Sequence, residues 1–280
     1  MQKSYKRYFP VFVLPTLAAF LIAFLAPFLM GIVLSFCRFT TVVDARFVGL
    51  DNYLRAFGDG EFLHAFWFTV LFTVAAVVTI NVLAFALAYI LTRGIRGTNL
   101  FRTVFFMPNL IGGIVLGYIW QLLLNGVLAR FGVTITADPK YGFMGLVVLM
   151  NWQMIGYMMI IYIAGIQNIP GDVIEAARID GANRAQTLFR VTIPMVMPSV
   201  TICLFLTLTN SFKLFDQKLA LTAGAPGKST EMLALNIYST FYGRNGWEGA
   251  GQAKAVVFFL VVALISLTQL YLTRTREVES

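Results

Sequence analysis

The sequence predicts an all-α integral membrane protein with six transmembrane helices, and this prediction rests on its composition and on six long apolar runs. Of the 280 residues, 59% are hydrophobic and 12% are charged, whereas a soluble domain has about 25% charged residues. A spanning helix needs about 20 predominantly apolar residues. Runs of this length cover residues 10–36, 65–91, 104–125, 143–167, 195–219 and 254–273.

The runs favour helices over other spanning structures. Backbone groups in lipid must be hydrogen-bonded within the protein, and a membrane β-barrel would show alternating segments of about ten residues. The runs here are continuous. Prolines such as Pro108 and Pro198 are compatible with this reading, because membrane helix bundles accept kinks.

The first run is expected to be a spanning helix and not a signal peptide. Basic residues precede it, but residues 8–36 exceed the roughly 7–15 residues of a signal-peptide core, and no small-residue cleavage site follows. Six spans place both termini on one side. The segments on that side, 1–8, 92–103, 168–194 and 274–280, hold more lysine and arginine than the opposite loops. We therefore expect both termini to be cytoplasmic.

Several other classes of protein are disfavoured by residue counts. The two cysteines, Cys37 and Cys203, cannot form a disulfide framework, and a single histidine, His64, leaves no histidine cluster for zinc. The net charge of +8 is dispersed between apolar runs, which suits anionic lipid headgroups better than nucleic acid. No Ser/His dyad, membrane aspartate pair or HExxH motif is present, so we expect no catalytic and no metal-ligating residues.

Residues 168–194 form the most informative segment between the runs. Pro170 and Asp172 suit a helix start, and Gly181 interrupts the helical pattern before a second short amphipathic stretch that Pro194 is expected to end. We predict two short helices with a hinge at the glycine. A capped connector and a functional element are both compatible with this pattern, although a loop of this length is more often functional.

This segment resembles the "EAA" loop of the permeases of binding-protein-dependent ABC importers. The resemblance rests on Glu175-Ala-Ala177, Asp180-Gly-Ala182, Phe189 and Ile193-Pro194, where Ile193 replaces the family's usual leucine. It implies the type I importer permease fold, with coupling helices that dock in a cleft of a cytoplasmic ATPase subunit. Gly181 would be the hinge and Glu175 a polar contact. The implied coupling residues are Glu175, Ala176, Ala177, Asp180, Gly181 and Ala182.

Three further segments are similar to the carbohydrate-type branch of that family, which includes the larger maltose permease and the first permeases of glycerol-phosphate and lactose importers. They are Phe47-Val-Gly-Leu-Asp-Asn-Tyr53, Phe101-Arg-Thr-Val-Phe-Phe-Met-Pro108 and Leu221-Thr-Ala-Gly-Ala-Pro-Gly-Lys-Ser-Thr230. The resemblance divides the chain into residues 1–64, with one helix and an external segment, and a permease core of residues 65–280.

The resemblance also implies a function and a set of partners. The chain would translocate a sugar by alternating access in a bacterial cytoplasmic membrane. It would work with a homologous second permease, two ATP-binding subunits and an external sugar-binding protein. It would bind no cofactor itself, since ATP and magnesium would lie on the partners. Residues 224–230 superficially resemble a phosphate loop, but the glycine spacing is wrong.

Polar residues inside the fourth and fifth runs predict a substrate-lining surface, because hydroxyl-rich ligands need many neutral donors and acceptors. Thr207, Asn210, Lys213 and Gln217 would share one helical stripe, and Asp216 would lie one turn after Lys213. The alternative role is polar contact between helices. The predicted lining residues are Asn151, Trp152, Gln153, Thr207, Asn210, Ser211, Lys213 and Asp216.

An ion-coupled secondary transporter is the alternative function. Such proteins often have inverted repeats, discontinuous helices and membrane carboxylates. Asp216 is the one plausible carboxylate in the apolar runs, and no inverted repeat is evident. The sequence therefore favours the ATP-driven importer.

Overall fold

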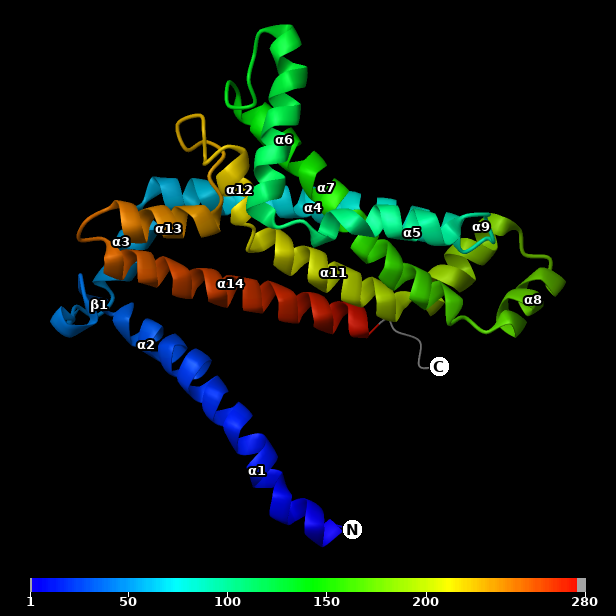
Figure 1. Ribbon diagram of the computed structural model, residues 1–280, viewed down its shortest axis with the longest axis horizontal. Coiled ribbons are helices and arrows are strands. Elements are labelled where there is room, and N and C mark those ends of the chain that lie inside the picture. Colours follow the sequence, from blue (N-terminus) through cyan, green and yellow to red (C-terminus); the bar gives the residue numbers. More distant parts are fainter. Residues whose placement is uncertain (1, 276–280) are drawn as a thin grey trace. The chain divides into compact units, whose positions relative to one another are not determined.

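The computed structural model describes residues 2–275 (Figure 1). Met1 and residues 276–280, which include both predicted cytoplasmic chain ends, lie outside the described residues. The chain divides into two compact units, one formed by residues up to Gly60 with Ile237–Phe259 and the other by Glu61–Asn236 with the residues from Leu260 onward. The predicted division into residues 1–64 and a permease core of residues 65–280 was drawn from the family resemblance. The two compact units do not test it, so it stays a prediction.

The first unit contains the N-terminal helices and a small hairpin. Strands β1 (Cys37–Arg38) and β2 (Arg46–Phe47) pair antiparallel. The buried Asn52 amide donates to the carbonyls of Ser35 and Cys37 at 2.9 and 2.8 Å, which ties the hairpin to a helix. Its elements are α1 (Gln2–Phe20), η1 (Leu21–Leu25), α2 (Ala26–Leu34), η2 (Val42–Asp44), α3 (Asp51–Gly58) and parts of α13 (Leu233–Gly243) and α14 (Glu248–Arg274).

The second unit holds most of the apolar helices and the segment that resembles the coupling loop. In order, its remaining elements are α4 (Gly60–Leu91), α5 (Thr98–Phe106), η3 (Met107–Leu110), α6 (Gly113–Leu128), η4 (Ala129–Phe131), α7 (Pro139–Gln167), α8 (Gly171–Ile179), α9 (Arg184–Thr187), η5 (Leu188–Thr192), α10 (Ile193–Met195), α11 (Met197–Phe212) and α12 (Asp216–Leu221).

The predicted spans are present in the part of the chain that the structure describes. Five helices are long and apolar enough to cross a bilayer: Val11–Leu34, Gly60–Leu91, Gly113–Phe131, Pro139–Gln167 and Glu248–Arg274. A sixth span results if Arg184–Met195 and Met197–Phe212, which meet at an angle of 70°, count as one bent span. Length and hydropathy therefore predicted the number of crossings.

Three helix boundaries differ from the prediction. The run 104–125 is broken, because Pro108 lies in a short 3₁₀ turn and Gly112 is extended before α6 begins. Pro194 does not end the second loop helix, which runs without a gap from Arg184 to Met195, and the break comes at Val196. The helix of the fifth run ends at Phe212, so the predicted stripe from Thr207 to Gln217 is not continuous.

The core of the second unit is built on close contact between α4 and its neighbours. Phe72, Ala76, Ile80, Ala84 and Ala88 are fully buried and recur every four residues, so they form one ridge of α4. The alanines permit close approach of helix backbones, the usual means of packing helices in lipid. Methionines and Tyr162 of α7 fill the facing space.

Gly156 marks the tightest of these contacts. A Cβ atom at this position of α7 would overlap the backbone carbonyl of Phe105, at the end of α5. Backbone atoms cannot rotate away as a side chain can, so only glycine fits here without a shift of α5. Helix α5 therefore lies against α7, and the break at Met107–Leu110 follows directly after α5.

We expect Gly156→Ala to lower the free energy of unfolding by about 1–3 kcal/mol, the usual cost of overpacking. Gly126→Ala in α6 is the matched control, because nothing lies within 4 Å of its Cβ position, and alanine there should stabilise the helix by about 0.5–1 kcal/mol. Denaturant unfolding in detergent, followed by circular dichroism, measures both changes. Equal effects of the two substitutions would contradict the contact.

Candidate functional site

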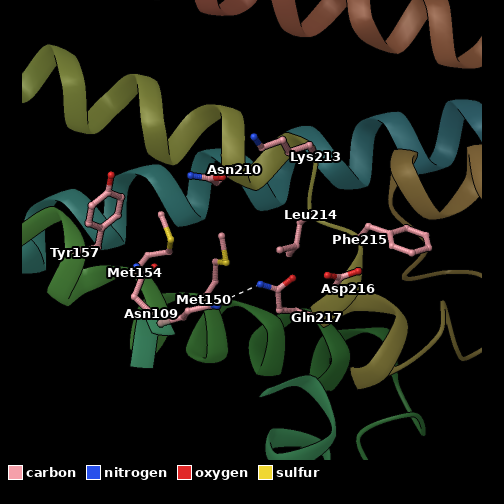
Figure 2. A pocket seen from close by; sticks show the side chains of 11 residues that line it. Asn109, Met150, Met154, Tyr157, Asn210, Lys213, Leu214, Phe215, Asp216 and Gln217 are labelled. Carbon is pink, nitrogen blue, oxygen red and sulfur yellow. Dashed lines mark hydrogen bonds between the residues drawn. The ribbon is translucent and has the colours of Figure 1, made fainter. Parts of the chain in front are cut away.

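A polar cavity of about 320 Å³ lies where α11 ends, within the second unit (Figure 2). Helix α7 forms one wall, and the end of α11, the turn 213–215 and α12 form the other. Figure 2 shows the lining side chains around this space. They are Asn109, Met150, Gln153, Met154, Tyr157, Asn210, Lys213, Leu214, Phe215, Asp216 and Gln217.

The cavity exists because the backbone leaves the helix after Phe212. Lys213 has non-helical backbone angles, and the next helix begins only at Asp216. Residues 213–215 therefore lie beside the end of α11 and the start of α12, and side chains from all three segments line the cavity. On an unbroken helix they would instead be spread along one stripe. Non-helical backbone at membrane depth is tolerated where it lines a polar cavity.

Hydrogen-bond donors and acceptors without charge dominate the polar lining. The Gln217 Nε2 atom donates to Gln153 Oε1 at 2.8 Å, a bond drawn in Figure 2. Asn109, Tyr157 and Asn210 add further amide and hydroxyl groups. The charged Lys213 and Asp216 are exposed, and among the described residues neither forms an ion pair, so the predicted contact between them is absent.

Half of the predicted lining residues meet at this cavity. Gln153, Asn210, Lys213 and Asp216 line it. Tyr157 lies one turn after Gln153 on α7, so helical spacing could have identified it as well. Asn109 could not be found that way, because it follows a helix break inside a run that we expected to be continuous.

The other four predicted lining residues lie outside this cavity, and for them the lining role stays a prediction. The Asn151 amide donates to Thr79 Oγ1 at 2.9 Å, and the Trp152 ring packs edge-on against Trp120. Thr207 and Ser211 are fully buried.

Thr207 takes part in a polar contact between three helices. Its hydroxyl accepts from Asn81 Nδ2 at 3.0 Å and donates to the carbonyl of Cys203 at 2.7 Å. Tyr162 donates to the Asn81 Oδ1 atom at 2.7 Å. These bonds join α4, α7 and α11, which is the helix-to-helix role that the sequence left open for this stripe.

The segment 168–194 has the predicted form of two short helices with a glycine between them. Gly181 has φ of +76°, a left-handed conformation that favours glycine. Ala182 N donates to the carbonyl of Ala177 at 2.9 Å, which closes α8. Asn183 and Gln186 form a capping box that starts α9. Glu175, Ala176 and Asp180 are exposed, and nothing lies within 4 Å of the Cβ position at Gly181.

Sequence comparison gives one family match and several long relatives. The family model described as "Binding-protein-dependent transport system inner membrane component" matches residues 93–277. The probable starch degradation products transport system permease protein AmyD of Thermoanaerobacterium thermosulfurigenes is 46% identical, over 96% of this chain and 94% of its own length. The multiple sugar-binding transport system permease protein MsmF of Streptococcus mutans is 31% identical, over 91% of each.

Structural comparison finds the same architecture in a bacterial ABC transporter that imports the acidic polysaccharide alginate. The match has a TM-score of 0.83 at 21% identity and covers 98% of both chains. A second structure of the alginate transporter, in complex with a pentasaccharide-bound periplasmic protein, matches with a TM-score of 0.82. These matches confirm the type I importer permease fold.

We expect Thr207→Val to lower the free energy of unfolding by about 1 kcal/mol, because the Asn81 amide loses a buried partner on another helix. Thr209→Val is the control, since its hydroxyl bonds only to carbonyls of its own helix. Unfolding in detergent should separate the two variants, and uptake should persist in both. Loss of uptake by Thr207→Val at unchanged stability would instead indicate contact with the transported ligand.

Proposed function

The chain belongs to the family of binding-protein-dependent transport system inner membrane components, and from this membership we propose that it is the sugar-translocating permease subunit of an ATP-driven ABC importer. The observation that carries the proposal is the 46% identity, over nearly the whole chain, to a permease named for starch degradation products. The chain would form part of the pathway and would hydrolyse nothing itself. The comparisons give no support to the ion-coupled alternative.

The proposed substrate is a neutral oligosaccharide or a related hydroxyl-rich solute. Relatives are named for starch degradation products, multiple sugars and trehalose or maltose. The amide groups of Gln153, Asn210 and Gln217 suit this chemistry, because each amide can both donate to and accept from a hydroxyl. Lys213 and Asp216 add one charge of each sign, so they leave the lining neutral overall.

The proposed assembly contains two ATP-binding subunits, a homologous second permease and an external sugar-binding protein. This chain offers no phosphate loop, and the fold family couples transport to nucleotide chemistry elsewhere. ATP and magnesium would bind the partner subunits. A periplasmic binding protein is part of the structurally similar alginate transporter, which supports the same kind of partner for this chain.

We place the chain in a bacterial cytoplasmic membrane with both termini and residues 168–194 on the cytoplasmic side. The excess of basic residues in the segments on that side supports this orientation. Helix α11 begins after residues 168–194 and ends at the cavity. In this orientation the cavity would lie farther from the cytoplasm than the coupling loop.

The proposed mechanism uses α11 as the link between the ATPase subunits and the cavity. Residues 168–194 would dock on the ATPase through the exposed faces at Glu175, Ala176 and Asp180. ATP binding would draw the ATPase subunits together and move the loop. The bent helix pair Arg184–Met195 and Met197–Phe212 would then open or close the cavity to one side of the membrane. Such coupling requires two states with different contacts at both sites.

Gly181→Val tests the coupling role. The valine must adopt a left-handed conformation that costs about 1–2 kcal/mol, so the two loop helices should lose their relative orientation. We expect ATP-dependent uptake in proteoliposomes to fall at least about tenfold with normal membrane insertion. Gly132→Val is the matched control, because Gly132 has φ of +70° and an open Cβ position but lies outside the loop. Uptake at the control's level would refute the role.

Asn210→Leu tests the lining role. Leucine has similar volume but cannot bond a hydroxyl, so the efficiency of uptake should fall about tenfold, the value of one or two hydrogen bonds. The neighbouring Thr209→Val, which lies outside the lining, is the control. Initial rates over a range of sugar concentrations, at equal amounts of assembled complex, measure the effect. Unchanged kinetics would remove Asn210 from the pathway.

A further inference from the structure

A second cavity, of about 500 Å³, lies beside the segment 168–194. Its walls come from the end of α4, the end of α7 and residues 174–192. It belongs to the second unit, as does the first cavity. The lining residues are Tyr89, Thr92, Arg93, Ile166, Ile169, Ile174, Arg178, Ala182, Arg184, Thr187 and Thr192.

Three arginines from three separate elements converge on this cavity, and no carboxylate lines it. Arg93 follows α4, Arg178 is in the last turn of α8, and Arg184 begins α9. Within residues 2–275, none of the three forms an ion pair. Like charges that share one space repel each other unless an anion lies between them.

The acidic residues of the loop point elsewhere. Asp172, Glu175 and Asp180 are on or next to α8, yet none of them lines the cavity. Ile174 and Arg178, four residues apart, share the face of α8 that does line it. The loop therefore separates its charges in part, since its carboxylates lie outside the lining and two of its three arginines, Arg178 and Arg184, belong to it.

The surroundings of the arginines suit a phosphate group. The Arg93 guanidinium stacks on the Tyr89 ring at 4.4 Å, which orients its planar donors. The buried Thr192 adds a hydroxyl to the same lining. The hydroxyls of Thr92 and Thr187 donate to the carbonyls of Tyr89 and Asn183, so the arginines are the main donors. Arginine binds phosphate through paired N–H donors in a fixed plane, and isoleucines on the remaining wall keep the site partly apolar.

We propose that this cavity binds a phosphate-bearing anion on the cytoplasmic side, held by Arg93, Arg178 and Arg184. Its source is either the headgroup of an anionic lipid or a soluble phosphate ester. Basic pockets between membrane helices bind lipid headgroups in this way. The ligand would join both loop helices to the end of α4. The cytoplasmic placement rests on the proposed orientation, whereas the binding itself does not depend on transport.

The test uses the full-length chain without ATPase subunits, so that no nucleotide site competes. In one arm, the chain in phosphatidylcholine nanodiscs is dialysed against radiolabelled glucose 6-phosphate. In the other, nanodiscs that also contain phosphatidylglycerol are analysed by native mass spectrometry for retained anionic lipid. We expect saturable binding of about one equivalent in one arm, which identifies the source.

A matched pair of variants locates the site. Arg178→Gln/Arg184→Gln should weaken binding at least about tenfold, while Arg96→Gln/Arg190→Gln removes the same charge from equally exposed positions outside the lining and should have no effect. If the cavity double variant does not insert, Arg184→Gln alone replaces it. Equal weakening by both pairs, or no saturable binding in either arm, overturns the proposal. Sugar uptake by the wild-type complex, measured separately, shows whether the proposed function fails with it.

Discussion

The structure depends on the cost of leaving backbone N–H and C=O groups without partners in lipid. That cost keeps most of the apolar runs helical, so the places where a helix ends inside a run become significant. Helix α11 is bounded by two such places, the bend at Val196 and the end at Phe212. One polar cavity follows its last residue, and the arginine-lined cavity lies before its first. A single helix therefore lies between the two polar sites.

Different parts of α11 serve different purposes. Near its middle, Thr207 bonds to Asn81, which Tyr162 also contacts, so this part is held against α4 and α7. Close to its end, Asn210 is free of such contacts between helices in the described structure and faces the cavity. The same class of neutral polar side chain thus joins helices at one point of α11 and lines a cavity at another. Residue type alone does not distinguish the two roles, but neighbouring helices do.

Hydropathy and one motif were enough to predict the apolar helices, the two-helix form of residues 168–194 and the family, because each depends on local features of the chain. The turn at Gly181 could be predicted, since few other residues tolerate its backbone angles. The cavity was only half predictable. Asn109 and the turn at Lys213 reach it through breaks in helices. Pro108 and Gly112 are local signals for the first break, but the helix end at Phe212 has no comparable signal in the sequence. Pro194 shows the reverse case, because a residue expected to end a helix lies within one that continues to Met195.

The central claim is that residues 168–194 contact a nucleotide-hydrolysing partner and that this contact changes with ATP. Ala176→Cys places a thiol on the exposed face of α8, and the two native cysteines are buried. Cross-linking of this thiol to cysteines in the co-expressed ATP-binding subunit, with and without ATP, measures the contact in membranes. The account predicts a cross-link whose yield changes on addition of ATP. No cross-link, together with labelling of the thiol by an impermeant reagent from outside intact cells, would contradict it.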